Sequence, residues 1–154
     1  MAINIAIEIS REFDLAASFD DVFELLADVP RSASHFPKLH NLEDLGGNAF
    51  RWEMEKIGVD KHALQTIYAC KYFSDKDKGR IWWEPVKGEG NGVVKGSWSL
   101  TRNGDDRTHA SFHTEAELSL PLPSLLKLAI SPVVKHEFNS LVDVYTRNLQ
   151  AAFQ

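Results

Sequence analysis

Isoleucine alternates with small or polar residues at the start of the chain. It occupies positions 3, 5, 7 and 9, and the positions between them hold Asn, Ala and Glu. A period of two places successive side chains on opposite faces of a strand. The pattern therefore predicts a strand with one buried face, which begins at Ile3 and continues to Phe13 or Leu15.

Two short helices are predicted after this strand. Ser18 is a favoured N-cap residue, and the acidic Asp20 and Asp21 suit the positive end of a helix dipole. Apolar residues at positions 22, 23, 25 and 26 give this helix one apolar side. Pro30 suits the first turn of a second short helix, which we expect to end between His35 and Pro37.

Between residues 38 and 120, alternating runs are separated by turn residues. The turn signals are GGN at 46–48, DKDKG at 75–79, GEGNG at 88–92 and NGDD at 103–106. Such stretches between alternating runs are typical of hairpins. The segment therefore predicts six strands that follow one another as a meander. Together with the first strand they make a seven-stranded antiparallel sheet.

The end of the chain is predicted to be a long helix. Pro121 and Pro123 end the run of strands, and residues 124–154 then have the spacing of a helix. Pro132 lacks the N–H that a helix interior needs, so we expect an interruption or a kink there. Helices at the two ends of a run of strands indicate an α+β fold. No linker or repeat divides residues 1–154, which are predicted to form a single domain.

Composition limits the classes of protein without naming a function. The chain has 154 residues, of which 44% are hydrophobic and 25% charged, as in globular domains. The net charge of −5 argues against nucleic acid as a partner. Cys70 is the only cysteine, so no internal disulfide can form, and we assign it a packing role. We see no signal peptide and no run of ~20 apolar residues, so a cytoplasmic protein without stable membrane insertion is expected.

Four stretches, which together cover nearly the whole chain, carry a family resemblance. They are FDLAASFDDVFELLAD (13–28), RIWWEP (80–85), GSWSL with NGDDRTHASF (96–112), and LPLPSLLKLAISPVVKHEFNSLVDVYTRNLQ (120–150). These stretches resemble the START-like superfamily, also called SRPBCC or Bet v 1-like, and most of all its bacterial polyketide cyclase/dehydrase, lipid-transport and coenzyme Q-binding members. The resemblance implies a helix-grip fold, in which a curved sheet encloses a pocket under the long C-terminal helix. It also implies a hydrophobic ligand such as a lipid, quinone or polyketide.

Aromatic and apolar residues of the predicted strands are candidates for the wall of that pocket. Trp82 and Trp83 are adjacent, so one faces inward and the other outward, and the family alternation indicates Trp83 inward. From the residues alone, such a set fills a solid core as readily as it lines a cavity. The resemblance favours the cavity. The ligand-binding candidates are Phe50, Trp52, Met54, Tyr68, Trp83, Trp98, Phe112, Val133, Glu137, Leu141 and Tyr145.

The last helix has two polar residues in its apolar stripe. At about 100° per residue, apolar positions 126, 130, 133, 134, 141, 144 and 145 share one face with Glu137 and Asn148. A buried acid needs a partner or a proton. Glu137 could therefore bind a polar group of a ligand or act as an acid or base. The alternative, which we prefer, is a structural bond to a sheet residue or exposure on a rotated helix.

Few other residues indicate chemistry. His109 and His113 share one face of a strand, but no third ligand of suitable geometry is evident, so we predict no metal site. No catalytic motif such as Gly-x-Ser-x-Gly is present, and no cofactor is predicted. We expect the protein to bind, transport or sequester a small hydrophobic molecule. The alternatives are a polyketide aromatase/cyclase or dehydratase that uses Glu137 and Tyr145, and a protein-interaction module.

Overall fold

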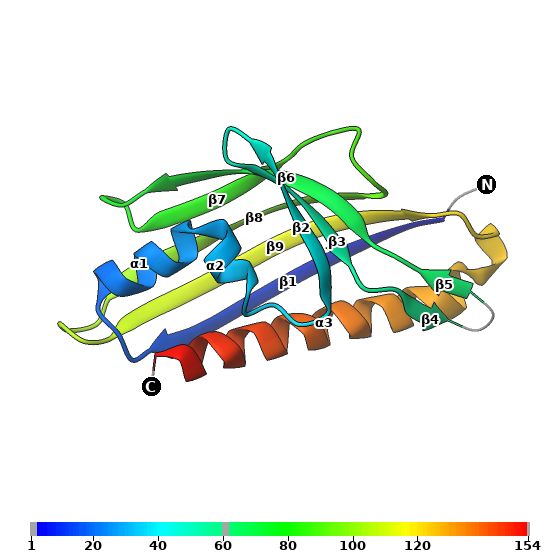
Figure 1. Cartoon of the computed structure of the whole chain (residues 1–154). Helices are drawn as coiled ribbons and strands as arrows, with labels where there is room; N and C mark the ends of the chain where they lie inside the picture. Colours follow the sequence, from blue (N-terminus) through cyan, green and yellow to red (C-terminus); the bar gives the residue numbers. More distant parts are fainter. Residues whose placement is uncertain (1–2, 60–61, 154) are drawn as a thin grey trace.

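One curved sheet and one long helix organise the chain (Figure 1). The computed structural model describes residues 3–59 and 62–153. Its elements are β1 (Ile3–Leu15), α1 (Phe19–Ala27), α2 (Val29–Ala33), β2 (Leu39–Gly46), β3 (Ala49–Met54), β4 (Ile57–Val59), β5 (His62–Leu64), β6 (Ile67–Asp75), β7 (Arg80–Pro85), β8 (Gly92–Arg102), β9 (Thr108–Leu120), the 3-10 helix η1 (Ser124–Leu126) and α3 (Lys127–Ala152). The predicted α+β order is confirmed.

The main sheet has seven antiparallel strands in the order β1-β9-β8-β7-β6-β3-β2. β1 and β9 pair along their whole length, from Ile3 opposite Leu120 to Leu15 opposite Thr108. In Figure 1 these two strands run alongside α3, whereas β2 and β3 cross it steeply, which shows how strongly the sheet curves. The seven-stranded antiparallel sheet is confirmed.

The sequence missed one small hairpin. β4 and β5 pair only with each other and form a two-stranded sheet beside the main one. Each has three residues, which is too short for a period of two to become visible. The four predicted turns do connect strands of the main sheet, as at residues 46–48, where φ is 87°, 60° and 63°. Glycine and asparagine adopt this left-handed conformation most easily, which is why GGN marks the turn.

The two helices after β1 begin as predicted. The Ser18 hydroxyl accepts a hydrogen bond from the Asp21 backbone N–H at 3.2 Å, and so caps α1. Pro30 lies in the first turn of α2, which Asp28 caps. α2 ends at Ala33, earlier than the predicted end between residues 35 and 37, and single turns follow it.

The last helix runs through Pro132 without interruption, so of the two predicted alternatives the interruption is wrong. Pro132 lies early in α3. Any other residue at this position would donate its backbone N–H to the carbonyl of Leu128, and proline has no N–H to donate. Leu128 is highly exposed, so water can replace the missing donor. The helix ends at Ala152, and the predicted final residue, Gln154, lies outside the described residues. Within the described ranges, none of the helices combines the length and the apolar character needed to cross a bilayer.

The core lies between the inner face of the sheet and α3. The inner face carries the four isoleucines of β1 and the buried residues of β8 and β9, and α3 packs Ile130, Val134 and Leu149 against them. Cys70 is fully buried here, and its thiol donates to the Val94 carbonyl at 3.3 Å. Burial raises the pKa of Cys70 to about 12, which keeps the thiol protonated and confirms its packing role.

A candidate ligand cavity between the sheet and the last helix

A cavity of about 90 Å³ lies between the inner face of the sheet, α2 and α3. Its wall contains aliphatic and aromatic side chains with a few hydroxyl groups, and none of its described lining residues is Asp, Glu, His, Lys or Arg. The wall consists of Ile7, Ile9, Leu26, Val29, Ser32, Phe36, Trp52, Met54, Thr66, Tyr68, Tyr72, Ile81, Trp83, Val94, Trp98, Phe112, Thr114, Ala116, Leu118, Phe138, Val142 and Tyr145. Pockets for drug-sized ligands measure roughly 300–1,000 Å³, so this cavity is small.

Most of the predicted ligand-binding residues lie in the cavity wall, and the others do not. Those in the wall are Trp52, Met54, Tyr68, Trp83, Trp98, Phe112 and Tyr145. Phe50 and Leu141 are buried in a neighbouring cluster with Val29 and Ala33. Val133 is 46% exposed, and Glu137 also lies outside the wall.

Trp83 faces the cavity and Trp82 faces outward, as the alternation predicted. The ring of Trp82 stacks on Phe73 on the outer face, with ring centroids 5.5 Å apart. Gly96 on the neighbouring strand makes room for Trp83, because a Cβ there would lie 2.5 Å from the Trp83 ring. The glycine of the GSWSL stretch therefore serves to seat a tryptophan of the next strand.

α3 is rotated relative to the predicted stripe. Phe138 and Val142 face the cavity, and Leu149 is fully buried, whereas the stripe had assigned inner positions to Val133 and Glu137. The rotation keeps a carboxylate out of an apolar interior, where an unpaired charge is costly. A pattern of apolar positions gives the direction of the buried face around the helix axis only coarsely. Successive residues are about 100° apart, so an error of one position turns the predicted face by that angle.

Polar contacts along both sides of α3 hold it over the sheet. Glu137 accepts a hydrogen bond from the ammonium of Lys38, in the α2–β2 connection, at 3.0 Å. Asn148 donates to the backbone carbonyl of His35 in the same connection at 2.9 Å. On the other side, Arg11 of β1 bonds to Asp143 at 2.8 Å. Glu137 thus pairs with a loop residue outside the cavity wall, whereas the preferred interpretation had placed its partner in the sheet.

Two of the three phenol groups in the wall have hydrogen-bond partners. The hydroxyls of Tyr145 and Ser32 are 2.5 Å apart, which joins α3 to α2 inside the cavity. The Trp52 indole donates to the Tyr72 hydroxyl at 2.9 Å. Burial raises the pKa of Tyr145 to about 12, so this phenol is neutral at physiological pH.

The third phenol, Tyr68, has no hydrogen-bond partner for its hydroxyl among the described residues. Its ring stacks on Trp52 at 5.8 Å between centroids, with 11° between the planes. Burial raises the pKa of Tyr68 well above its usual value, so the hydroxyl stays protonated. The Tyr68 hydroxyl is therefore an uncommitted, neutral hydrogen-bonding group at a mostly apolar cavity.

Several wall residues were not predicted from the sequence. Ser32 and Phe36 come from α2 and the connection after it, and Phe36 lies 5.1 Å from the Tyr145 ring. α2 has five residues, which is too short for periodicity to show which side faces inward. Thr66 precedes β6 in a connection that showed no pattern. Only the three-dimensional arrangement brings these residues to the cavity.

A possible metal-binding group lies on the opposite, outer face of the sheet. Glu8, His113 and Glu115 offer ligand atoms within 4.8 Å of one another. Glu8 and Glu115 are direct neighbours across β1 and β9, and Lys95 lies 3.4 Å from Glu115. The Lys95 ammonium already balances part of the negative charge that a metal ion would meet. His109 is not part of this group, because it bonds to two acidic residues of β1.

The sequence matches no protein-family model and no curated protein. Solved structures do match. A START superfamily protein from Mycobacterium smegmatis is 16% identical with a TM-score of 0.66, over 95% of this chain and 96% of that chain. An aromatase/cyclase from Streptomyces sp. R1128 is 16% identical with a TM-score of 0.62, over 96% and 91%. Norcoclaurine synthase from Thalictrum flavum, in complex with dopamine and hydroxybenzaldehyde, is 16% identical with a TM-score of 0.58, over 94% and 86%.

These matches extend over almost the whole chain at low sequence identity, so they concern the fold. They agree with the arrangement that the sequence stretches implied and that this chain has, a curved antiparallel sheet with a long C-terminal helix. The chain therefore has the START-like, helix-grip fold.

Proposed function

We propose that this protein binds a small, neutral, mostly apolar molecule in the cavity under α3, and that the molecule has one hydroxyl or carbonyl group. The observation that supports this is the Tyr68 hydroxyl, which has no protein partner in the described chain and faces a mostly apolar wall. Its oxygen is accessible to water, so water can bond to it when no ligand is bound. A ligand with one polar group would replace that water and cover the apolar surface at the same time.

The absence of charged residues from the described wall argues for a neutral ligand. A carboxylate or an ammonium group would have to leave water without an opposite charge to receive it. A hydroxyl or a carbonyl has a much lower desolvation penalty and can bond to a phenol. Among the ligand classes expected from the sequence, a quinone-like ring meets these conditions better than a fatty acid does.

The size of the cavity favours a single ring. A cavity of about 90 Å³ does not hold a lipid or a polyketide chain unless the wall moves. Stacked and tilted aromatic rings make up much of this wall, and flat faces of this kind suit a flat ligand. One structural relative is in complex with dopamine and hydroxybenzaldehyde, and the second of these is a neutral single ring with a hydroxyl and a carbonyl group.

Binding is proposed in preference to cyclase or dehydratase chemistry. Glu137, one catalytic candidate, pairs with Lys38 outside the cavity. Tyr145, the other, shares a hydrogen bond with Ser32, and its pKa is raised to about 12. General acid–base catalysis works best with a pKa near the working pH, and neither residue offers such a group at the cavity.

Uptake of two matched probes tests the proposal. Toluene and 4-methylphenol have almost the same shape, and only the second carries a hydroxyl. We expect both to shift the indole N–H signals of Trp83 and Trp98 in NMR titrations, because both side chains line the cavity. 4-Methylphenol should bind about two- to tenfold more tightly, which corresponds to one net hydrogen bond. If neither probe produces a saturable shift, the cavity is not a binding site and the proposal is wrong.

The Tyr68→Phe substitution should remove the preference for the hydroxyl. We expect the affinity for 4-methylphenol to fall to that for toluene, and the affinity for toluene to stay the same. The free energy of unfolding should change by less than about 0.5 kcal/mol, because the hydroxyl has no partner to lose in the described chain.

Tyr145→Phe is the matched control, since it removes a hydroxyl that does have a partner. Urea denaturation should show a loss of about 1–2 kcal/mol, because the Ser32 hydroxyl is left unpaired in a buried position. Equal selectivity between the probes in the wild type and in Tyr68→Phe would exclude Tyr68 as the polar contact.

A further inference from the structure

The start of the last helix carries the two most exposed large hydrophobic residues of the described chain. Leu125 in η1 and Leu128 in α3 are each 91% exposed. They are three residues apart in helical backbone, so they lie on the same side. Single exposed leucines are common on protein surfaces, but an adjacent pair with almost no contacts marks a surface for interaction.

The same side of α3 continues with a proline, a lysine and a histidine. Pro132, Lys135 and His136 follow Leu128 at intervals of four, seven and eight residues, and all three are exposed. Ile130 on the other side is buried against the sheet. The beginning of α3 therefore has one face for the core and a second face, apolar and then basic, that points away from it.

The stretch of sequence around these leucines has a charge opposite to that of the whole chain. The net charge is −5, yet residues 118–136 contain no Asp or Glu and include Lys127 and Lys135. The next acidic residue, Glu137, is paired with Lys38 at 3.0 Å. We call Leu125, Lys127, Leu128, Pro132, Lys135 and His136 the basic-apolar tip. It offers positive charge beside exposed apolar side chains, on an otherwise acidic protein.

We infer that the basic-apolar tip docks on the surface of an anionic lipid bilayer. The two leucines would enter the boundary between headgroups and acyl chains, and the lysine ammonium groups would contact the anionic headgroups. Protein interfaces are depleted in lysine and bury about 800 Å² on each partner, which two leucines do not supply. A lipid surface needs neither a complementary shape nor a large area, so it fits this tip better than a protein does.

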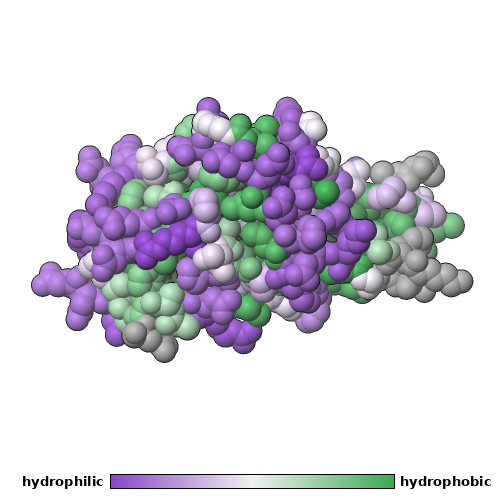
Figure 2. All heavy atoms as spheres, viewed as in Figure 1, coloured by the Kyte–Doolittle hydropathy of each residue, from purple (hydrophilic) through white to green (hydrophobic). Residues whose placement is uncertain are grey.

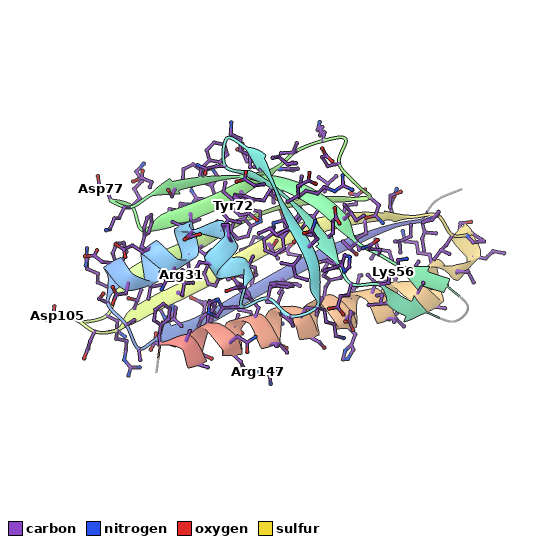
Figure 3. The ribbon with its side chains drawn as sticks, in the orientation of Figure 1. Arg31, Lys56, Tyr72, Asp77, Asp105 and Arg147 are labelled. Carbon is purple, nitrogen blue, oxygen red and sulfur yellow. The ribbon has the colours of Figure 1, made fainter. Side chains whose placement is uncertain are left out.

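The position of the tip in the molecule agrees with docking. In Figure 1, η1 and the start of α3 lie at one end of the molecule beside β4 and β5, at the opposite end from α1. Figure 2 shows hydrophobic atoms at the surface of this end, and Figure 3 shows side chains there that extend away from the body. None of the tip residues lines the cavity, so docking is independent of what the cavity binds.

Sedimentation with vesicles tests this inference. The full chain should sediment with phosphatidylcholine vesicles that contain phosphatidylglycerol, and much less with phosphatidylcholine alone. Added salt should weaken the binding, since exposed charges are screened. The double variant Leu125→Ser with Leu128→Ser should bind at least about tenfold more weakly, because both apolar anchors are lost. Lys127→Gln and Lys135→Gln should each weaken the binding by about fivefold.

Val93→Ser is the matched control, because Val93 is 49% exposed on the outer face of β8, which is the face of the sheet that is turned away from α3. It should bind vesicles like the wild type. Circular dichroism should show native folding in all variants, since every changed residue is exposed. The inference is wrong if the wild type does not bind phosphatidylglycerol vesicles, or if Val93→Ser loses as much binding as the leucine variant. It is also wrong if ultracentrifugation shows that the leucines hold a dimer together and hide the tip.

Discussion

Replacing Trp98 with alanine is expected to lower the free energy of unfolding by about 3–5 kcal/mol. Trp98 is 2% exposed and stands where β8, β9 and α3 meet. Its ring centroid lies 4.8 Å from that of Phe112, 5.9 Å from Phe13 and 6.2 Å from Tyr145. The substitution removes the shared partner of three aromatic rings and leaves a void that the stiff sheet cannot close.

Urea denaturation followed by circular dichroism measures this loss, and Trp82→Ala provides the comparison. Trp82 stacks on Phe73 on the outer face, where it is only half-buried. Its removal should reduce the free energy of unfolding by about 1 kcal/mol. Because domains of this size are stable by only about 5–15 kcal/mol, Trp98→Ala should remove a large part of the free energy of unfolding. Equal losses for the two variants would contradict the assignment of Trp98 to the centre of the core.

The second large effect is expected for ligand binding. Ala116→Leu should abolish the uptake of toluene and 4-methylphenol and leave the protein at least as stable as before. Ala116 lies in the cavity wall on β9, so a leucine there would place its extra carbon atoms inside a space of about 90 Å³. Filling a void restores contacts that the wall lacks, which stabilises the fold by up to about 1 kcal/mol. Loss of binding together with unchanged or higher stability distinguishes a filled site from a damaged fold.

Ala6→Leu is the control for this substitution. Ala6 lies on β1 next to Ile7, the direct partner of Ala116, but its side chain is on the outer face of the sheet. The same added carbon atoms should change neither the NMR titrations nor the unfolding curve by much. If Ala116→Leu still binds both probes with wild-type affinity, the probes bind elsewhere and the cavity under α3 has no part in their uptake.

The arrangement of the elements could be predicted from the sequence because local signals were strong. The isoleucines of β1, the capping Ser18 and the GGN turn each have one favoured structure, and all three agree with the fold. The short β4–β5 hairpin and the inner side of α2 carried no such signal, because a few residues do not define a period.

The candidate site was predicted less completely, for two physical reasons. The face of α3 depends on packing against the sheet, which moved Phe138 inward and Glu137 outward. The volume of the cavity depends on how aromatic rings pack between strands that are not consecutive in the chain, as Trp52 of β3 and Tyr68 of β6 do. Neither property is local, so spacing alone could not reveal that Tyr68 has a free hydroxyl while Tyr145 does not.

The contacts between α3 and the α2–β2 connection, beside the cavity, affect how quickly the proposed ligand could enter and leave. The Lys38 and Glu137 side chains are 55% and 23% exposed, and an ion pair of this kind contributes only about 0–1 kcal/mol. Such a weak contact is not expected to hold α3 in place by itself. Phe36 leans on both Trp52 and Tyr145 in the cavity wall. We therefore expect the residence time of the proposed ligand to depend more on the rearrangement of these packed rings than on ionic strength.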